Sequence, residues 1–231
     1  MPYLGNEVAP LVQALEGKEL KLDSDGDSSI TADTDDQIDI KVGGSDKLKI
    51  DANSHLVTNT SGTNNLVLGV NAGNSIASGS NYNVCIGDEA GTALTTGDEN
   101  TAVGFESLAT EDAHGENTAI GYRALKALNA GANGYNVAVG ARCGIVMTTG
   151  TKNTGVGSYS LNTLSTGANN TAVGQGALNA DTKGNKSVAI GVDSLTNQNF
   201  TSSTDSNNTA VGCTSGNNIT TGTSNTFVGF E

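Results

Sequence analysis

The sequence is poor in the residues that build a conventional globular core. Its 231 residues include no tryptophan, two prolines and only 4% aromatic residues, and 35% are hydrophobic. That share is low for a globular domain of this length. The 31 glycines, together with many Asn and Thr, disfavour long helices. We therefore expect short strands and frequent turns in a fold that repeats small contacts along its length.

Positive charge is also scarce. The formal net charge is −13, and the sequence pI is about 4.3. The acidic residues are concentrated at the front, since residues 1–60 contain twelve Asp or Glu and only five Lys. Such a surface repels a phosphate backbone, so we expect no nucleic-acid partner.

Cysteines and long apolar runs are few. Cys85, Cys143 and Cys213 form no CxxC pair, so we expect small buried thiols rather than a disulfide framework or a metal site. No apolar run approaches the roughly 20 residues that cross a bilayer. The N-terminus lacks the basic region and apolar core of a secretory signal. We expect no membrane insertion.

Motifs for catalysis or cofactor binding are missing as well. His55 and His114 have no triad or metal spacing, and the stretch VGQG lacks the Lys of a phosphate loop. The acidic stretch DSDGD at 23–27 lacks the Gly and Glu positions of an EF-hand, so we interpret it as a solvated turn. We expect no enzyme, no cofactor and no metal. A polysaccharide depolymerase is the enzymatic alternative, and its carboxylates would come from the one dense acidic cluster of the repeats: Glu106, Glu111, Asp112 and Glu116.

A short repeat covers residues 61–231. A glycine closes each unit, at Gly69, Gly87, Gly104, Gly121, Gly140, Gly157, Gly174, Gly191, Gly212 and Gly229. The intervals are 18, 17, 17, 19, 17, 17, 17, 21 and 17 residues. A period of 17 is too short for a helical hairpin or a propeller blade, and it suits one coil of a β-solenoid.

The two residues before each glycine form apolar columns on opposite faces of a strand. The valine column directly precedes the glycine: Leu68, Ile86, Val103, Ile120, Val139, Val156, Val173, Ile190, Val211 and Val228. We expect this column to form the coil core, with Val103, Ile120, Val139, Val173, Ile190 and Val211 as its representatives.

The alanine column lies one residue earlier: Val67, Cys85, Ala102, Ala119, Ala138, Gly155, Ala172, Ala189, Ala210 and Phe227. We expect it to face outward, where an apolar column needs a partner. Small side chains let backbones approach closely, so we expect a homo-oligomer with an interface through Ala102, Ala119, Ala138, Ala172, Ala189 and Ala210.

Three further features have structural interpretations. Asn occupies the fourth position before the glycine in nine units, with Ser187 the exception, and we expect a stacked ladder with left-handed turn geometry rather than a ligand-binding row. The pairs SL and AL after the glycine predict a second short strand with inward side chains. A threonine column (Thr101, Thr118, Thr154, Thr171, Thr209, Thr226) shares the parity of the valine column, which disfavours an ice-binding face.

The longer intervals contain inserted loops, ALNAGANGYN and TNQNFTSSTDSNN. Insertions are where a solenoid displays variable chemistry. We expect Tyr135, Asn199 and Phe200 to provide adsorption contacts.

The repeats resemble a known family. NTAVGFESL, NTAIGYRAL, NTAVGQGAL and SVAIGVDSL are similar to the left-handed parallel β-roll repeats of trimeric autotransporter adhesin heads, and the 17-residue form with TTG or STG is more similar to repeats of bacteriophage tail-fibre and related virion proteins. The resemblance implies an all-β, left-handed, homotrimeric β-roll of about ten coils. An autotransporter would also carry a signal peptide, a stalk and an anchor, which are not seen here, and this favours the phage family.

The front of the chain is a different segment. Period-two stretches over 18–51 predict half-buried antiparallel strands with these residues on one face: Leu20, Leu22, Ile38, Ile40, Val42, Leu48 and Ile50. Residues 1–17 show helical spacing and predict a short docking helix. We therefore expect a docking segment at 1–17, an acidic strand segment for virion attachment at 18–60, and the β-roll at 61–231.

These expectations combine into one functional hypothesis. The chain is a structural fibre protein of a bacteriophage virion, assembled in the host cytoplasm, attached to other virion proteins by its N-terminal segment and presenting loops to a host receptor or glycan. The alternatives are a capsid-mounted decoration protein with no receptor role and an autotransporter-like adhesin head.

Overall fold

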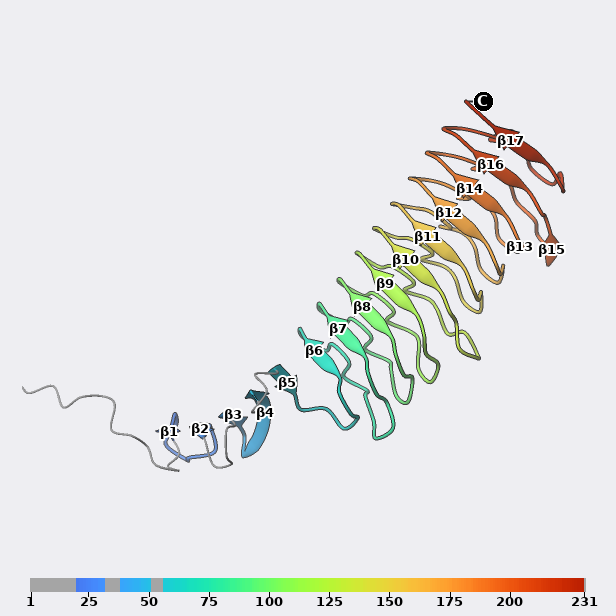
Figure 1. Ribbon diagram of the computed structural model, residues 1–231. Helices are drawn as coiled ribbons and strands as arrows, with labels where there is room; N and C mark the ends of the chain where they lie inside the picture. Colours follow the sequence, from blue (N-terminus) through green and yellow to red (C-terminus); the bar gives the residue numbers. More distant parts are fainter. Residues whose placement is uncertain (1–19, 32–37, 51–55, 231) are drawn as a thin grey trace, which may run out of the picture. The chain divides into compact units, whose positions relative to one another are not determined.

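The computed structural model describes residues 20–31, 38–50 and 56–230 (Figure 1). The chain divides into two compact units, residues 1–59 and 60–231. The segment 1–17 and its expected helix lie outside the described residues. No described helix has the length and apolar character needed to cross a membrane.

The first unit contains a five-stranded antiparallel sheet. Its strands are β1 (Leu20–Lys21), β2 (Ser29–Thr31), β3 (Ile38–Val42), β4 (Ser45–Ile50) and β5 (Leu56–Thr58), in this order across the sheet. Ile30 pairs with Leu20 and Ile40, and Ile40 pairs with Leu48, so the apolar residues share one face as predicted.

The exposure of that sheet differs from the expectation of a half-buried apolar face. Ile30, Ile38 and Ile50 are 37%, 45% and 38% exposed. The opposite face is buried and polar, with Ser29 and Thr31 among its residues. The alternation was predicted correctly, but the apolar side of this sheet lies open.

The second unit is a parallel β-solenoid of ten turns with repeats of about 17 residues, which confirms the all-β repeat fold (Figure 1). The strands of its sheet are β6 (Leu66–Leu68), β7 (Val84–Ile86), β8 (Thr101–Val103), β9 (Thr118–Ile120), β10 (Val137–Val139), β11 (Thr154–Val156), β12 (Thr171–Val173), β14 (Val188–Ile190), β16 (Thr209–Val211) and β17 (Thr226–Val228). Equivalent residues pair in register throughout, for example Ala102 with Ala119. A second small sheet pairs β13 (Gly184–Asn185) with β15 (Thr204–Asp205).

The closing glycines of the first nine coils are required by the coil-to-coil distance. Gly104 has φ +126°, and a Cβ added to it would lie 2.6 Å from the carbonyl oxygen of Gly121 in the next coil. A side chain at this corner would strain the backbone and push neighbouring coils apart. The glycine column therefore reflects architecture.

The two apolar columns face opposite to the sequence expectation. The expected interface residues Ala102, Ala119, Ala138, Ala172, Ala189 and Ala210 are 0–1% exposed within a single chain and form part of its core. The expected core residues Val103, Ile120, Val139, Val173, Ile190 and Val211 lie on the outer face and are half-buried or exposed. The coil interior is narrow and already contains large leucines, so the second to ninth coils have only Ala, Gly or Cys beneath the strand.

Those leucines lie at the fourth and seventh positions after the glycine. Leu108, Leu125 and Leu161 occupy the fourth position with φ of 48–53° and are at most 1% exposed. Leu128 and Leu164 occupy the seventh and are fully buried. The expected inward fillers are confirmed, but the segment is a turn and not a second strand.

The asparagine ladder is confirmed. The Oδ1 atom of Asn136 accepts the backbone N–H of Asn153 at 3.0 Å, and the Nδ2 of Asn153 donates to the carbonyl of Gly167 at 2.8 Å. The left-handed conformation lies one residue earlier than expected, for example at Lys152 with φ 58°. This arrangement turns the amide inward, where it replaces backbone hydrogen bonds that the turn leaves open.

Candidate functional site

The outer face of the ten-stranded sheet is an extended uncharged surface. It consists of the valine column and, two residues earlier in each strand, the outer threonine column. The latter comprises Leu66, Val84, Thr101, Thr118, Val137, Thr154, Thr171, Val188, Thr209 and Thr226. None of these twenty residues is buried, and Ile120, Val156 and Ile190 are 39%, 37% and 39% exposed. Both columns point outward, so the argument against an ice-binding face from inward parity was wrong.

The inserted loops contribute fewer free side chains than expected. Tyr135 is 49% exposed, and Asn199 is half-buried. Phe200 is 5% exposed, and its backbone N–H is bound by a buried carboxylate, so the expectation that it contacts a receptor was wrong. The exposed part of that loop lies just after it, at residues 201–203.

Buried carboxylates hold both inserted coils. Glu111 is fully buried one coil before the 19-residue unit, and its Oε2 accepts the N–H of Ala130 at 3.1 Å. Asp181 is fully buried one coil before the 21-residue unit, and its Oδ1 accepts the N–H of Phe200 at 3.1 Å. Both stand at the seventh position after the glycine, where Leu94, Leu128 and Leu164 lie in other coils. Each therefore supplies an acceptor to the start of an insertion.

The surroundings of Glu111 also shift the pKa of its carboxyl group. Its Oε1 lies 3.2 Å from Nδ1 of His114 and accepts the backbone N–H of that residue at 3.3 Å. Burial raises the pKa of Glu111, and the hydrogen bonds from Ala130 and His114 oppose this shift. With its oxygens bound to the coil, Glu111 acts as a structural anchor.

The rest of the acidic cluster is similarly engaged. Glu106 forms ion pairs with Arg123 and Lys126, and the hydrogen bond from Lys126 is the largest cause that lowers its pKa. Glu116 accepts a hydrogen bond from Asn133 at 2.8 Å. Two of the four carboxylates proposed for a depolymerase are thus held by protein cations or amides.

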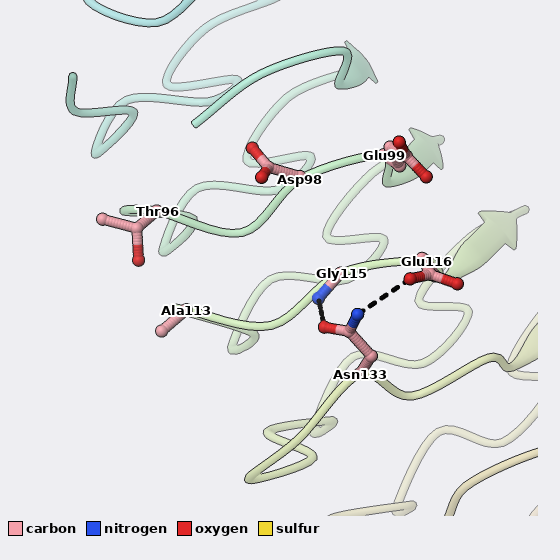
Figure 2. Close-up of a pocket in the computed structure, with 7 residues that line it drawn as sticks. All are labelled: Thr96, Asp98, Glu99, Ala113, Gly115, Glu116 and Asn133. Carbon is pink, nitrogen blue, oxygen red and sulfur yellow. Dashed lines mark hydrogen bonds between the residues drawn. The ribbon is translucent and has the colours of Figure 1, made fainter. Parts of the chain in front are cut away.

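A shallow polar cleft of about 170 Å³ lies beside this region (Figure 2). It is lined by Thr96, Asp98, Glu99, Ala113, Gly115, Glu116 and Asn133. The amide of Asn133 bridges two coils, because its Oδ1 accepts the N–H of Gly115 at 3.2 Å while its Nδ2 binds Glu116 (Figure 2). The cleft is formed by stacked turns.

Within the described part of the chain, two side-chain groups have the spacing of potential cation ligands. Glu111, Asp112 and His114 place one ligand atom each within 4.8 Å of one another, and so do Asp23, Asp25 and Asp27. Glu111 uses its oxygens for the hydrogen bonds given above. In the second group, the hydrogen bond with the Ser28 side chain is the largest cause that lowers the pKa of Asp23 to about 2. The backbone N–H groups of Ser28 and Gly26, which donate to Oδ1 of Asp23, lower it further. These contacts are those of an acidic turn.

Aromatic and arginine side chains form a ladder that the sequence reasoning missed. The rings of Phe105 and Tyr122 stack with centroids 5.6 Å apart. The guanidinium of Arg123 lies 5.0 Å from the Tyr122 centroid, and that of Arg142 lies 5.8 Å from Tyr122 and 5.5 Å from Tyr159. All five occupy the first or second position after the glycine. That shared position was the available sequence signal.

The chain matches no protein-family model, no curated protein and no solved structure.

Proposed function

We propose that the chain is a subunit of a trimeric bacteriophage virion fibre, in which the solenoid is a rigid shaft or head. One observation carries this proposal: an uncharged, largely β-branched outer face runs along all ten coils, and none of its residues is buried in the single chain. Exposed apolar surface of this extent marks an interaction site. Copies of the chain therefore associate through the outward valine column in this proposal, and not through the buried alanine column.

Copies of the same chain are the natural occupants of this face. Its side chains repeat at the strand spacing of about 4.8 Å, and a partner can interdigitate over ten coils only if it repeats at the same spacing. A second copy of the chain has the same spacing, because its coils are identical. The chain carries a net charge of −13 elsewhere, so an uncharged face is also where copies approach with least repulsion.

The remaining surfaces fit the other parts of a fibre protein. The open apolar face of the N-terminal sheet, with Ile30, Ile38 and Ile50, is suited to attachment to another virion protein. The inserted coils provide exposed polar loops for host adsorption. The similarity of the NTAVG repeats to those of phage fibres supports a place on the virion surface, at the tail or capsid, after assembly in the host cytoplasm. A capsid decoration or an adhesin head would use the same association face.

The mass of the purified chain in solution tests this proposal. We expect light scattering to give three times the 23.2 kDa chain mass. Val173→Arg puts charge on the association face and should yield monomers, because an unpaired charge in an interface costs several kcal/mol. Thr166→Arg adds the same charge at an exposed position outside the strand face and should stay trimeric. A monomeric or dimeric wild type would overturn the proposal.

Ice binding is a second candidate, favoured by the outward threonine and valine columns. Hydroxyl and methyl groups repeated at one spacing on an exposed sheet can order water in the same way at every coil. Thermal hysteresis of the wild type, together with a monomeric mass and loss of the effect in Thr171→Lys, would support this function over fibre assembly.

A further inference from the structure

We propose that the ladder of Phe105, Tyr122, Arg123, Arg142 and Tyr159 binds a carboxylated glycan. The ladder spans the third to sixth coils and is exposed at its aromatic residues, with Phe105, Tyr122 and Tyr159 38%, 41% and 39% exposed. The inference rests on the proposed function in one respect: the bound sugar would belong to the host surface to which the fibre adsorbs. The site itself lies apart from the inserted loops.

The charge around the ladder is positive in a strongly acidic protein. Among the residues that the structure describes, Glu106 is the one carboxylate that forms ion pairs with this group of cations, and it binds Arg123 and Lys126. Arg142 is the third cation of the group. Three of the six cations in residues 61–231 lie here. This local excess attracts an anion that the remainder of the surface repels.

The ladder also holds its donors in place. Arg142 stacks between Tyr122 and Tyr159, and its Nη1 donates to the Tyr159 hydroxyl at 2.8 Å. Among the described residues, Nε and Nη2 of Arg142 and both Nη atoms of Arg123 have no hydrogen-bond partner. Stacking fixes the plane of a guanidinium, and its free fork then matches a carboxylate. The exposed ring edges carry partial positive charge and favour the same ligand.

The spacing of the two guanidinium groups selects the kind of polymer. Arg123 and Arg142 occupy the same position in successive coils, which lie about 4.8 Å apart. This is close to the length of one sugar residue in a glycan chain. In an extended acidic peptide, side chains on one face recur only about every 6.6 Å, twice the rise per residue. The repeat of the coils is therefore shorter than the same-face repeat of an extended acidic peptide, which disfavours a peptide strand as the ligand.

Variation along the columns supports a localised site. The valine column stays apolar in all ten coils, whereas the second position after the glycine changes from Glu89 and Glu106 to Arg123 and Arg142 and later to Asp193. A surface needed for uniform packing along the whole solenoid would not alternate in charge. The cationic stretch is thus bounded by carboxylates on both sides, which sets a length of a few sugars.

Calorimetric titration of the full chain with tetragalacturonate at low salt tests the inference. We expect saturable binding that weakens at least tenfold in Arg142→Gln and Arg123→Gln, and also in Arg142→Lys, which retains the charge and loses the fork. Lys183→Gln removes the same charge outside the ladder and should bind as the wild type does. Circular dichroism and solution mass verify that each variant is assembled.

Three results would overturn the inference: no binding of tetragalacturonate, equal binding by Arg142→Gln, or tetraglutamate binding as tightly as the sugar. Neutral maltotetraose should not bind. If it bound as tightly as tetragalacturonate, recognition of the sugar carboxylate would be contradicted. The adsorption role is tested separately on particles. Virions with Arg142→Gln that adsorb normally, combined with lost sugar binding in the purified variant, would support the site and count against its role in adsorption.

Discussion

At the residue scale, the period fixes which residues share a column but not which column faces the interior. Val173 and Ala172 both look suitable for a core, because each belongs to a column that is apolar in all ten units. The deciding quantity is volume, since the buried leucines Leu161 and Leu164 leave space only for methyl-sized groups under the strand. A 17-residue coil has a small cross-section. Comparing the volume of its leucines with that cross-section would have identified the alanine column as the inner one.

Thiol reactivity tests this assignment. Cys85 occupies the alanine column, Cys143 lies at another small inward position, and both are fully buried, whereas Cys213 is exposed. Burial raises the pKa of Cys85 to about 12 and that of Cys143 to about 11, so neither forms a thiolate near neutral pH. We expect a thiol reagent at pH 8 to label one cysteine per native chain and three after denaturation. Rapid native labelling of Cys85 would mean that the alanine column faces outward.

At the element scale, coils of unequal length are accommodated by polar substitutions inside the stack. Ser187 interrupts the asparagine ladder, and Gln198, in a leucine position, replaces the missing amide: its Oε1 accepts from Nδ2 of Asn208 at 2.8 Å, and its Nε2 donates to Ser187 at 2.7 Å. The ladder itself could be predicted from its period. These compensations could not, because they depend on contacts between columns that the sequence does not place side by side.

Replacing the carboxylate anchor should loosen one inserted coil. Glu111→Leu restores the common side chain but leaves the N–H groups of Ala130 and His114 without their acceptor, which should cost about 1–3 kcal/mol. We expect faster hydrogen exchange at residues 129–135, with little change in distant coils. Asp112→Asn, a change at the neighbouring residue, is the matched control. Unchanged exchange at Ala130 would show that the carboxylate does not hold the insertion.

The same variant has a distinct pH dependence. Burial raises the pKa of Glu111 in the folded chain above the value of about 4.3 expected when unfolded. The folded state therefore binds this proton more tightly, and the group's contribution to stability grows as the pH falls from above the raised pKa toward 4. The free energy of unfolding of the wild type should exceed that of Glu111→Leu by more at pH 4 than at pH 7. Urea titrations at both values measure this difference.

At the scale of the whole molecule, the repeat and the register of the coils could be predicted from the sequence. The outward-facing valine column and the aromatic and arginine ladder were found only in the structure. The closing glycines gave the number of coils, because the backbone approaches too closely at Gly104 for any side chain. The ladder around Arg142 was not evident, because its members lie 17 to 20 residues apart and become neighbours only when the coils stack. The core and the association face thus recur in every coil and can be found from the period, whereas the aromatic and arginine ladder is confined to the third to sixth coils.

Adsorption measurements on particles separate a receptor-binding fibre from a decoration protein. Deleting residues 201–204 returns the 21-residue unit to 17 and removes exposed loop while Phe200 and its anchor Asp181 remain. Neighbouring coils have this length, so we expect the trimer to assemble normally. Multivalent attachment multiplies a weak single-site affinity by roughly 10² to 10⁴, so the loss should be larger for virions than for isolated trimers. Assembled particles that adsorb at the wild-type rate would assign the receptor contact to another surface or another protein, and the loop would then be a structural extension of its coil.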